Sequence, residues 1–570
     1  MDIKEQANFI WSIADLLRGN FKQSEYGKVI LPFTVLRRFD CVLAPSKEEI
    51  LERNKSLAVS NKAPIFKKYT GHDYYNVSKF DFEKLIDDSS SIDTNLKDYI
   101  NGFSDDVKEI LDNFEIATII EKLKKAGLLY LVVQKFSEIN LGADTIDNLE
   151  MGYMFEELIR KFSEQSNETA GEHFTPREVI ELMVEVLLDT DLDEITTTDG
   201  KVITILDPAC GTGGMLSIAQ NKIRALNSTT TVIPFGQELN PETYATCKSD
   251  MILKNNTNSK IVFGNSFSED GFREQKFDYI LSNPPFGVEW KKVKNFIENE
   301  SKHKGYDGRF GAGTPRISDG SLLFLQHMIS KMQPIEKGGS RIGIVFNGSP
   351  LFSGDAGSGE SEIRKWIIEK DLLEAVIGLP DQLFYNTGIS TYVWILTNRK
   401  TDRRKGKIRL INGTSFFGKM RKSLGNKRNE ITESDRKEIV RLYSTYEHDE
   451  NYIDFDNDDF GYRKITIERP LYDENREVVV EKGNPKPNSK LRDTETVPFK
   501  EDIHEYFKRE VLPHVPDAWI DEKKTKIGYE IPFTRHFYKF TPLRESSVIL
   551  DEIKQLEEKI QKSLNELFKG

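Results

Sequence analysis

The chemistry of this chain is indicated first by four consecutive residues, Asn283, Pro284, Pro285 and Phe286, which follow the apolar run 277–282. Two successive prolines cannot donate backbone hydrogen bonds, so a strand formed by the apolar run must end there. Open α/β sheets bind ligands at the carboxyl ends of their strands. A side-chain acceptor, a backbone carbonyl and an aromatic ring at that edge suit a flat heterocycle with an exocyclic amino group. For Asn-Pro-Pro alone, an ordinary strand end in a turn is the alternative.

A second candidate site follows the apolar run 202–206 and consists of an acid and a glycine-rich turn: Asp207, Gly211, Thr212, Gly213 and Gly214. Glycines let the backbone approach a ligand closely, and a helix that begins near Met215 would direct its free N–H groups at that ligand. The pattern is neither Gly-x-Gly-x-x-Gly nor a phosphate loop, which disfavours a nucleoside triphosphate. Asp207 suits a cationic group, such as the ammonium of an amino acid.

Polar residues also follow the next two apolar runs. Glu238 lies just after residues 231–235, where a carboxylate can accept two hydrogen bonds from a ribose diol. Asn265 and Ser266 follow residues 260–263, where they could contact an adenine edge. Each of these residues alone could cap a loop. Their succession at the ends of consecutive strands, ahead of Asn283, is a more specific pattern.

These residues need parallel strands to bring them together. From about residue 150 to 400, short β-rich runs alternate with helical stretches, which is typical of a parallel α/β architecture. Strands are expected at residues 202–206, 231–235, 260–263, 277–281, 341–346, 373–377 and 391–397. Helices are expected at residues 215–226, 241–253 and 321–332. Two glycine-rich stretches, 305–320 and 354–359, are interpreted as mobile lids over a substrate, with ordinary surface loops as the alternative.

The flanking regions differ from this core. Residues 1–150 carry apolar side chains at helical spacing and no catalytic constellation, which predicts a mostly helical domain. After about residue 475 the chain becomes polar and contains prolines, which favours a linker. The chain ends in an amphipathic helix with a narrow apolar stripe: Ile549, Ile553, Leu556, Ile560, Leu564 and Leu567. The stripe fits a coiled-coil partner or packing against the chain itself.

Composition narrows the class of protein. No apolar run approaches the length that spans a membrane, and the polar N-terminus has no signal-peptide pattern. The three cysteines lie far apart without metal-ligand spacing, so we expect no disulfide framework and no metal site, as in a reducing cytoplasm. The net charge of −12 argues against nucleic-acid contact over the whole surface. Residues 399–428, however, contain twelve Lys or Arg and one acid, which favours a phosphate-facing surface over a solvated loop.

The order of these motifs resembles that of the S-adenosylmethionine-dependent amino-methyltransferases of DNA. Residues 171–177 (Gly-Glu-His-Phe-Thr-Pro-Arg) are similar to the cofactor-wrapping motif of adenine methyltransferases. Residues 378–389 (Gly-Leu-Pro-Asp-Gln-Leu-Phe-Tyr-Asn-Thr-Gly-Ile) and residues 10–39 are similar to the modification (M) subunit of type I restriction-modification systems. The resemblance covers nearly the whole chain and is weakest from residue 480 to 530.

The resemblance implies an α/β fold with a Rossmann-like methyltransferase core at residues 151–475. It implies a mostly helical domain at residues 1–150, and a linker and C-terminal helical docking region at residues 476–570. The implied cofactor is S-adenosyl-L-methionine, and no metal is required. The implied catalytic residues are Asn283, Pro284, Pro285 and Phe286. The implied cofactor-binding residues are Glu172, His173, Phe174, Thr175, Pro176, Arg177, Asp207, Gly211, Thr212, Gly213, Gly214, Glu238, Asn265 and Ser266.

The implied reaction is direct transfer of a methyl group to N6 of adenine in DNA, and the residue types agree with it. The lone pair of an exocyclic amine is delocalised into the ring. Accepting its protons at the Asn283 side-chain oxygen and the Pro284 carbonyl favours a pyramidal, nucleophilic nitrogen. A base inside a duplex must first be flipped out, and Phe286 would then be its stacking surface.

The resemblance also implies partners. These are double-stranded DNA, a separate specificity (S) subunit bound by two modification subunits, and a restriction (R) subunit in the full complex, all in the cytoplasm and without a membrane. A domain that reads several base pairs needs substantial mass and basic surface. Because few residues follow 475, we expect specificity to come from the partner. The terminal stripe is our candidate for the surface that docks on it.

Three other functions stay open. Asn-Pro-Pro-aromatic motifs also serve in the methylation of glutamine amides in proteins, and closely related motifs serve in the methylation of cytosine N4. Phe286 and the Phe-Thr-Pro segment at residues 174–176 favour adenine over cytosine, and the basic segment favours DNA over protein. A non-catalytic assembly scaffold is disfavoured by the intact Asn283 and glycine loop.

Overall fold

The structure is a computed structural model that describes residues 3–166, 175–254, 258–385, 388–424, 426–538 and 545–567. The chain forms two compact units, residues 1–531 and residues 532–570.

The first unit begins with a helical region, as predicted. Its helices are α1 (Ile3–Leu17), α2 (Tyr26–Leu43), α3 (Lys47–Ser56), α4 (Ala63–Thr70), α5 (Phe82–Ile86), α6 (Ile92–Asn101), α7 (Asp105–Asn113), α8 (Ile116–Lys125), α9 (Leu129–Ser137) and α10 (Asn148–Ser166). They share one apolar core, to which α2 contributes residues at helical spacing such as Leu36 and Phe39. Arg38 of α2 is fully buried and donates to the carbonyls of Leu141 and Ile146 at 2.5 and 2.8 Å. These bonds tie α2 to the segment that leads into α10.

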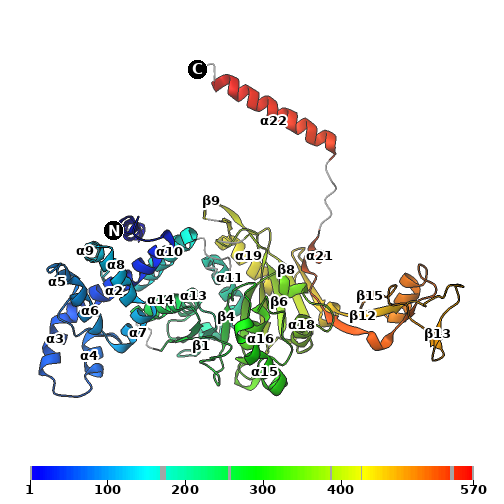
Figure 1. Cartoon of the computed structure of the whole chain (residues 1–570), viewed down its shortest axis with the longest axis horizontal. Coiled ribbons are helices and arrows are strands. Elements are labelled where there is room, and N and C mark those ends of the chain that lie inside the picture. The colour runs from blue at the N-terminus through cyan, green and yellow to red at the C-terminus, as the bar shows by residue number, and fades with distance from the viewer. Residues whose placement is uncertain are drawn as a thin grey trace. The chain divides into compact units, whose positions relative to one another are not determined.

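A nine-stranded sheet in the order β11-β8-β6-β7-β5-β4-β1-β2-β3 forms the centre of this unit (Figure 1). The strands are β1 (Val202–Asp207), β2 (Thr231–Glu238), β3 (Lys260–Phe263), β4 (Tyr279–Ser282), β5 (Arg341–Asn347), β6 (Leu373–Gly378), β7 (Thr391–Thr397), β8 (Lys407–Asn412) and β11 (Tyr452–Asp456). Only β7 and β11 run antiparallel to their neighbours in this sheet. Strands β1 to β6 and β8 therefore end at one edge, which we call the rim.

All seven strands predicted from the sequence are present, and the parallel α/β core is confirmed. The antiparallel direction of β7 was not predicted, because the sequence of a strand buried on both faces does not indicate whether the strand runs parallel or antiparallel to its neighbours. The helices of this region are α11 (Arg177–Leu188), α12 (Leu192–Thr197), α13 (Gly214–Leu226), α14 (Pro241–Leu253), α15 (Lys294–Lys304), α16 (Ser321–Ser330), α17 (Ser349–Phe352), α18 (Gly359–Glu369) and α19 (Glu433–Ser444). Helices α11, α13, α14 and α19 share an apolar cluster with the sheet. Right-handed crossovers put α16 and α18 on the opposite face (Figure 1).

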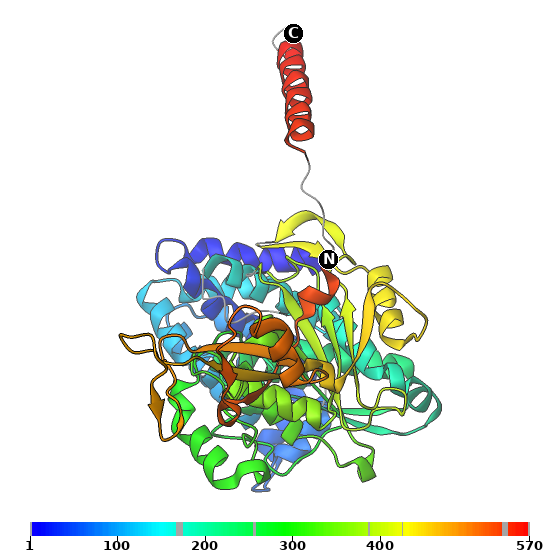
Figure 2. The ribbon, with the colours of Figure 1, turned by 90° about the vertical axis from the view of Figure 1, so that its right-hand side faces the viewer.

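Two smaller β-structures extend the core. Beyond β8, strands β9 (Gly418–Leu424) and β10 (Lys427–Glu430) form an antiparallel two-stranded ribbon, shown in yellow in Figure 2. After residue 460 a second, antiparallel sheet is built from β12 (Gly461–Glu468), β15 (Asp493–Pro498), β16 (Trp519–Ile520) and β17 (Lys526–Tyr529), with the hairpin β13 (Val480–Glu481) and β14 (Asn484–Pro485) and the short helix α20 (Ile503–Tyr506). The polar, proline-containing region after about residue 475, which the sequence predicted to be a linker, thus contains strands of the fold, among them β14 and β15.

The second sheet is fastened to the first unit by buried polar contacts. The Arg364 guanidinium on α18 donates from Nε to the Tyr529 carbonyl at 2.6 Å, and the Tyr529 N–H donates to the Ser361 hydroxyl at 3.0 Å. The Ile531 N–H donates to the Leu351 carbonyl at 2.8 Å. The second sheet is therefore a packed part of this unit.

The second unit contains α21 (Phe533–Phe537) and α22 (Ser546–Leu567). The predicted terminal helix is confirmed by α22. Four residues of its apolar stripe, Ile549, Ile553, Leu556 and Ile560, are 42% to 59% exposed. The side chains of Leu564 and Leu567 lie outside the described part of the chain. No helix of the described residues combines the length and the apolar character that crossing a membrane requires.

Candidate active site

Asn283 lies at the rim, directly after β4, as predicted. Its side-chain nitrogen donates to the Thr175 hydroxyl at 2.8 Å. Its side-chain oxygen, Oδ1, is buried and has no hydrogen-bond partner among the described residues. A buried acceptor without a partner costs free energy, on the order of 1 to 3 kcal/mol. Such a cost at a strand end points to a ligand group that donates a hydrogen bond there.

The three residues after Asn283 are buried or half-buried. Pro284 is buried and Pro285 is half-buried. Phe286 is 9% exposed and belongs to the apolar cluster that covers one face of the sheet. Most of the predicted stacking ring is thus held by the core, which fixes its orientation.

Asp207 ends β1 and lies beside β4. Its Oδ1 accepts hydrogen bonds from the Ala209 N–H at 3.0 Å and from the Ser282 hydroxyl at 2.9 Å, so it is tied to the residue before Asn283. Burial raises the pKa of Asp207 to about 7, although both hydrogen bonds lower it. A neighbouring cation would stabilise the carboxylate of such an acid. This position therefore suits the ammonium group that the sequence predicted.

The predicted glycine loop connects β1 to α13, which begins at Gly214. Thr212 of this loop is half-buried. Gly211 and Gly213 have φ values of 53° and 85°, which favour glycine. A Cβ on Gly213 would lie 2.7 Å from the Cys247 sulfur of α14. Gly213 is thus required both by its backbone conformation and by the close approach of α14.

Glu238 ends β2 and holds the glycine loop. Its Oε2 accepts from the Gly211 N–H at 2.8 Å, and its Oε1 accepts from the Asn240 N–H at 2.8 Å. Burial raises the pKa of Glu238, while the hydrogen bonds from Asn240 and Gly211 lower it. Each carboxylate oxygen keeps a second lone pair, so Glu238 can still accept a hydrogen bond from a diol.

Asn265 and Ser266 follow β3, and both side chains stabilise the loop. Asn265 Oδ1 accepts from the Phe267 N–H at 2.8 Å. The Ser266 hydroxyl donates to the Pro208 carbonyl at 2.5 Å, which joins this loop to the residue after Asp207. Contact of either residue with a cofactor stays a prediction.

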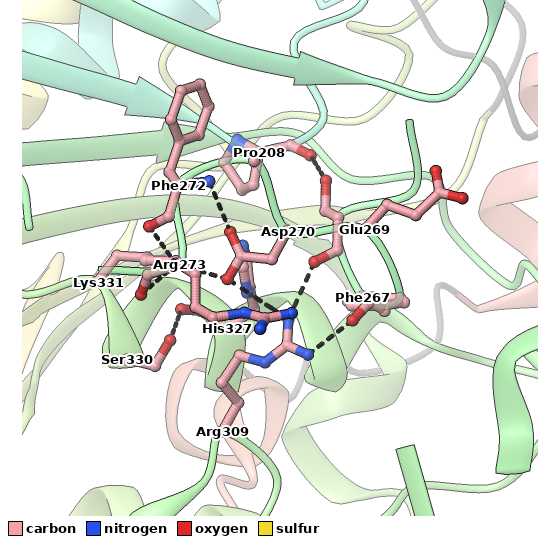
Figure 3. A network of polar contacts seen from close by, with 12 residues as sticks. Pro208, Phe267, Glu269, Asp270, Phe272, Arg273, Arg309, His327, Ser330 and Lys331 are labelled. Atoms are coloured by element: carbon pink, nitrogen blue, oxygen red, sulfur yellow. Dashed lines mark hydrogen bonds and ion pairs between the residues drawn. The ribbon is translucent and has the colours of Figure 1, made fainter. Parts of the chain in front are cut away.

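The sequence did not identify Arg309, which donates hydrogen bonds to backbone carbonyls of the loop after β3, including that of Phe267 (Figure 3). Its Nη1 donates to the Ser266 carbonyl at 3.0 Å and its Nη2 to the Phe267 carbonyl at 2.6 Å. Its Nε and Nη2 also donate to the Glu300 carboxylate, at 3.1 and 2.7 Å. Nη1 lies 3.2 Å from Nδ1 of His327.

This network is fully paired. Burial, together with the charge of Arg309, lowers the pKa of His327 to about 3, so the imidazole is neutral and its Nδ1 accepts the bond from Arg309. All five N–H groups of Arg309 then have acceptors. Lys331 completes the cluster by donating to Asp270 at 2.6 Å and to the Phe272 carbonyl at 2.7 Å.

Arg309 belongs to the glycine-rich stretch 305–320, which the sequence predicted to be a mobile lid or a surface loop. The structure differs from the lid prediction. Phe310 is completely buried, and Arg309 ties the stretch to the loop after β3. The stretch therefore acts as a support for the site.

The predicted cofactor-wrapping segment is described in part. Glu172, His173 and Phe174 lie outside the described residues. Thr175 accepts the bond from Asn283, and Pro176 caps the N-terminus of α11. Arg177 lies 4.1 Å from the centre of the Tyr153 ring and donates to the Tyr153 hydroxyl. Over the described ranges, no three His, Cys, Asp or Glu residues form a group that could hold a metal ion.

Comparison with known proteins agrees with this geometry. Residues 147–460 match the family described as N-6 DNA Methylase, and residues 6–136 match the HsdM N-terminal domain. The type I restriction enzyme MjaIX methylase subunit of Methanocaldococcus jannaschii is 26% identical over 487 residues, which are 81% of this chain and 80% of that protein. The HindI methylase subunit of Haemophilus influenzae is 31% identical over 280 residues, which are 48% of this chain and 55% of that protein.

The fold is similar to a solved structure. The crystal structure of the type I restriction-modification system methyltransferase subunit from Streptococcus thermophilus aligns with a TM-score of 0.64 at 22% identity. The alignment covers 80% of this chain and 96% of that chain.

Proposed function

This chain belongs to the N-6 DNA Methylase family and is an adenine-specific DNA methyltransferase, and from that premise we propose that it is the modification subunit of a type I restriction-modification system. In this role it uses S-adenosyl-L-methionine as methyl donor and acts on an adenine that has been flipped out of double-stranded DNA. The observation that carries the proposal is the buried Asn283 Oδ1, which has no partner among the described residues.

The acceptor of Asn283 has a defined role in this reaction. Because the Thr175 hydroxyl accepts from the amide nitrogen, the oxygen end of the amide is the end available to a substrate. The amino group of adenine has two protons, which Asn283 Oδ1 and the Pro284 carbonyl accept. The nitrogen lone pair then becomes available for attack, so catalysis rests on orientation and electrostatics. Phe286 stacks on the flipped base.

The residues at the rim fit the methyl donor. Asp207, a buried acid with a raised pKa, receives the ammonium group, and Glu238 receives the ribose hydroxyls. The glycine loop gives the backbone access to the ligand, and Asn265 with Ser266 borders the adenine. Residues 172–177 are assigned to donor binding as well, because they resemble a cofactor-wrapping motif. When bound, S-adenosyl-L-methionine supplies an electrophilic methyl group on its sulfonium sulfur.

Sequence specificity is assigned to a partner. We propose a specificity subunit that binds two modification subunits, and restriction subunits in the full complex. Residues 476–570 include the docking region, and the exposed stripe of α22 is the surface that meets the specificity subunit.

A direct test is methyl transfer by this chain, assembled with its neighbouring subunits, from a donor with an isotopically labelled methyl group. Mass spectrometry of the digested DNA is expected to find the label in N6-methyladenine. The Asn283→Ala variant is expected to lose this product. Label in N4-methylcytosine, or in a glutamine of a protein substrate, would contradict the proposal. The absence of transfer to any substrate would instead support an assembly scaffold.

A further inference from the structure

The basic segment 399–428 separates into two classes of side chain in the fold. Seven of its twelve cations have acidic partners within 4.0 Å. These are Arg399 with Asp191, Lys400 with Asp371, Arg404 with Glu374, Lys405 with Asp402, Lys407 with Asp456, Arg409 with Asp454 and Lys427 with Glu178. Most of these acids come from other parts of the sequence. More than half of the cations in the basic segment therefore already have an acidic partner in the fold, and the pair of Lys405 with Asp402 is largely exposed.

The remaining cations lie at opposite edges of the sheet. Arg403 is exposed and stacks on Tyr446, and it lies in the loop between β7 and β8, away from the rim. Lys419, Arg421 and Arg428 are exposed on the β9–β10 ribbon. The side chain of Lys422 lies outside the described part of the chain. The only acid in the ribbon sequence is Glu430, at its end.

The ribbon is held firmly along one strand. The Asn426 and Arg428 N–H groups of the β10 side donate to the carbonyls of Tyr385 and Gln382, at 2.7 and 2.9 Å. The Asn429 side chain donates to the Asp381 carbonyl at 2.8 Å. These acceptors belong to residues 378–389, the segment that resembles type I modification subunits. That segment thus builds the base of the ribbon, and β9 with Lys419 and Arg421 forms its outer strand.

A second anchor connects the ribbon to the candidate active site. Lys427 is buried and pairs with Glu178 on the first turn of α11, and its Nζ donates to the Leu383 carbonyl at 3.0 Å. Glu178 lies three residues after Thr175, which accepts the bond from Asn283. Residues 175–178 therefore contact both Asn283, through Thr175, and the ribbon, through Glu178.

The ribbon also lies at the rim, because it follows the end of β8 and rests on the loop after β6 (Figure 2). In the strand order, β8 is four positions from β4. At a spacing of about 4.8 Å per strand, the ends of β8 and β4 are roughly 19 Å apart. One DNA strand carries about five phosphates over that distance. A duplex that presents an adenine to Asn283 can therefore reach the ribbon.

We propose that Lys419, Arg421 and Arg428 bind backbone phosphates of the DNA that flanks the target adenine. The proposal rests on the activity on DNA stated above. Long, exposed cationic side chains on a rigid ribbon suit phosphate oxygens, which carry no sequence information. Asn429, which could have contacted a base edge, is buried and holds the Asp381 carbonyl. The ribbon thus contributes affinity for DNA and leaves base recognition to the partner.

The test compares two variants that each remove two positive charges. One is Lys419→Gln with Arg421→Gln on the ribbon. The matched control is Arg403→Gln with Lys405→Gln, on exposed residues at the opposite edge. Both are assembled with the neighbouring subunits. Binding is measured by fluorescence anisotropy on a labelled duplex that carries a site methylated by the wild type, between about 50 and 200 mM NaCl.

The ribbon variant is expected to bind the duplex at least about tenfold more weakly than the control, and its salt slope is expected to fall by about two. Its kcat at saturating DNA should match that of the wild type. Charge-conserving Lys419→Arg with Arg421→Lys should restore binding, which separates loss of charge from loss of folding.

Equal affinity and equal salt slope in both charge-removing variants would overturn the proposal. So would loss of subunit assembly with unchanged DNA affinity, since the cations would then serve a protein partner. If the wild type binds DNA but methylates none, the proposed function fails, and the same variants compared on any duplex that the wild type binds still test the ribbon.

Discussion

The side-chain nitrogen of Asn283 donates a hydrogen bond to the Thr175 hydroxyl at 2.8 Å, and the amide oxygen is left as a buried acceptor without a partner among the described residues. An asparagine amide can rotate so that its oxygen and nitrogen exchange places. With Thr175 accepting from the nitrogen, the oxygen remains as the buried acceptor at the rim. The pair joins the end of β4 to the residues that begin α11.

The first prediction concerns Thr175. Thr175→Val removes the hydroxyl but keeps the shape, and we expect kcat to fall by up to about tenfold, the value of one hydrogen bond. Thr175→Ser keeps the hydroxyl and should retain most of the activity. Steady-state methylation kinetics with saturating DNA provide the measurement. If Thr175 only contacted the methyl donor, the valine variant would show a raised KM for the donor and an unchanged kcat.

The second prediction concerns the pH dependence of donor binding. The pKa of Asp207 is raised to about 7, so below that pH the group is mostly a neutral acid. An ammonium group binds the carboxylate, and its binding should therefore strengthen as the pH rises through 7. We expect the affinity for S-adenosyl-L-methionine to increase by about tenfold between pH 6 and pH 8.

Isothermal titration at several pH values measures this effect. Asp207→Asn cannot titrate, so its affinity should be low and nearly independent of pH in this range. An affinity of the wild type that stays constant from pH 6 to pH 8 would show that Asp207 does not receive the ammonium group.

The third prediction concerns Arg309 and the loop after β3. Lysine has three donors where Arg309 has five, so Arg309→Lys leaves acceptors such as His327 Nδ1 and the Ser266 carbonyl without partners. The loop that contains Ser266 then loses hydrogen bonds that help to hold it beside Pro208. We expect the affinity for S-adenosyl-L-methionine to fall roughly tenfold, corresponding to one or two lost hydrogen bonds.

A matched control lies in the same glycine-rich stretch. Arg316 is half exposed and donates to the Ser349 hydroxyl, and it makes no described contact with the loop after β3. Arg316→Lys should leave donor affinity unchanged. An equal loss of affinity in both variants would mean that the stretch acts only through general stability, which thermal unfolding of the two variants would reveal.

The rim residues could be predicted because each follows an apolar run in the sequence. Asp207, Glu238 and Asn283 come after strands whose parallel arrangement is dictated by the alternation with helices. The carboxyl ends of such strands share one edge, so the residues had to meet. The hydrogen bonds of Asp207 with Ser282 and of Glu238 with Gly211 could be identified only from the structure.

Other features could not be predicted, because their partners are distant in the sequence. The acids that neutralise Arg399 and Lys427 are Asp191 and Glu178, more than 200 residues away. A count of local charges could not distinguish these cations from the exposed Lys419. Likewise, glycines around Arg309 are typical of a mobile loop, and only the fold brings Arg309 to the Ser266 carbonyl.

The last prediction concerns the apolar stripe of α22, whose described side chains are exposed. Ile553 and Leu556 are 56% and 58% exposed, which is unfavourable for large apolar side chains unless a partner covers them. Ile553→Asp with Leu556→Asp should abolish co-purification with the specificity subunit, because two buried charges would oppose docking.

The control Glu552→Gln with Lys554→Gln alters polar neighbours on the same helix and should co-purify normally. Donor binding should be equal in all three proteins, since α22 belongs to a separate unit from the rim. Full assembly of the aspartate variant would assign docking to another surface.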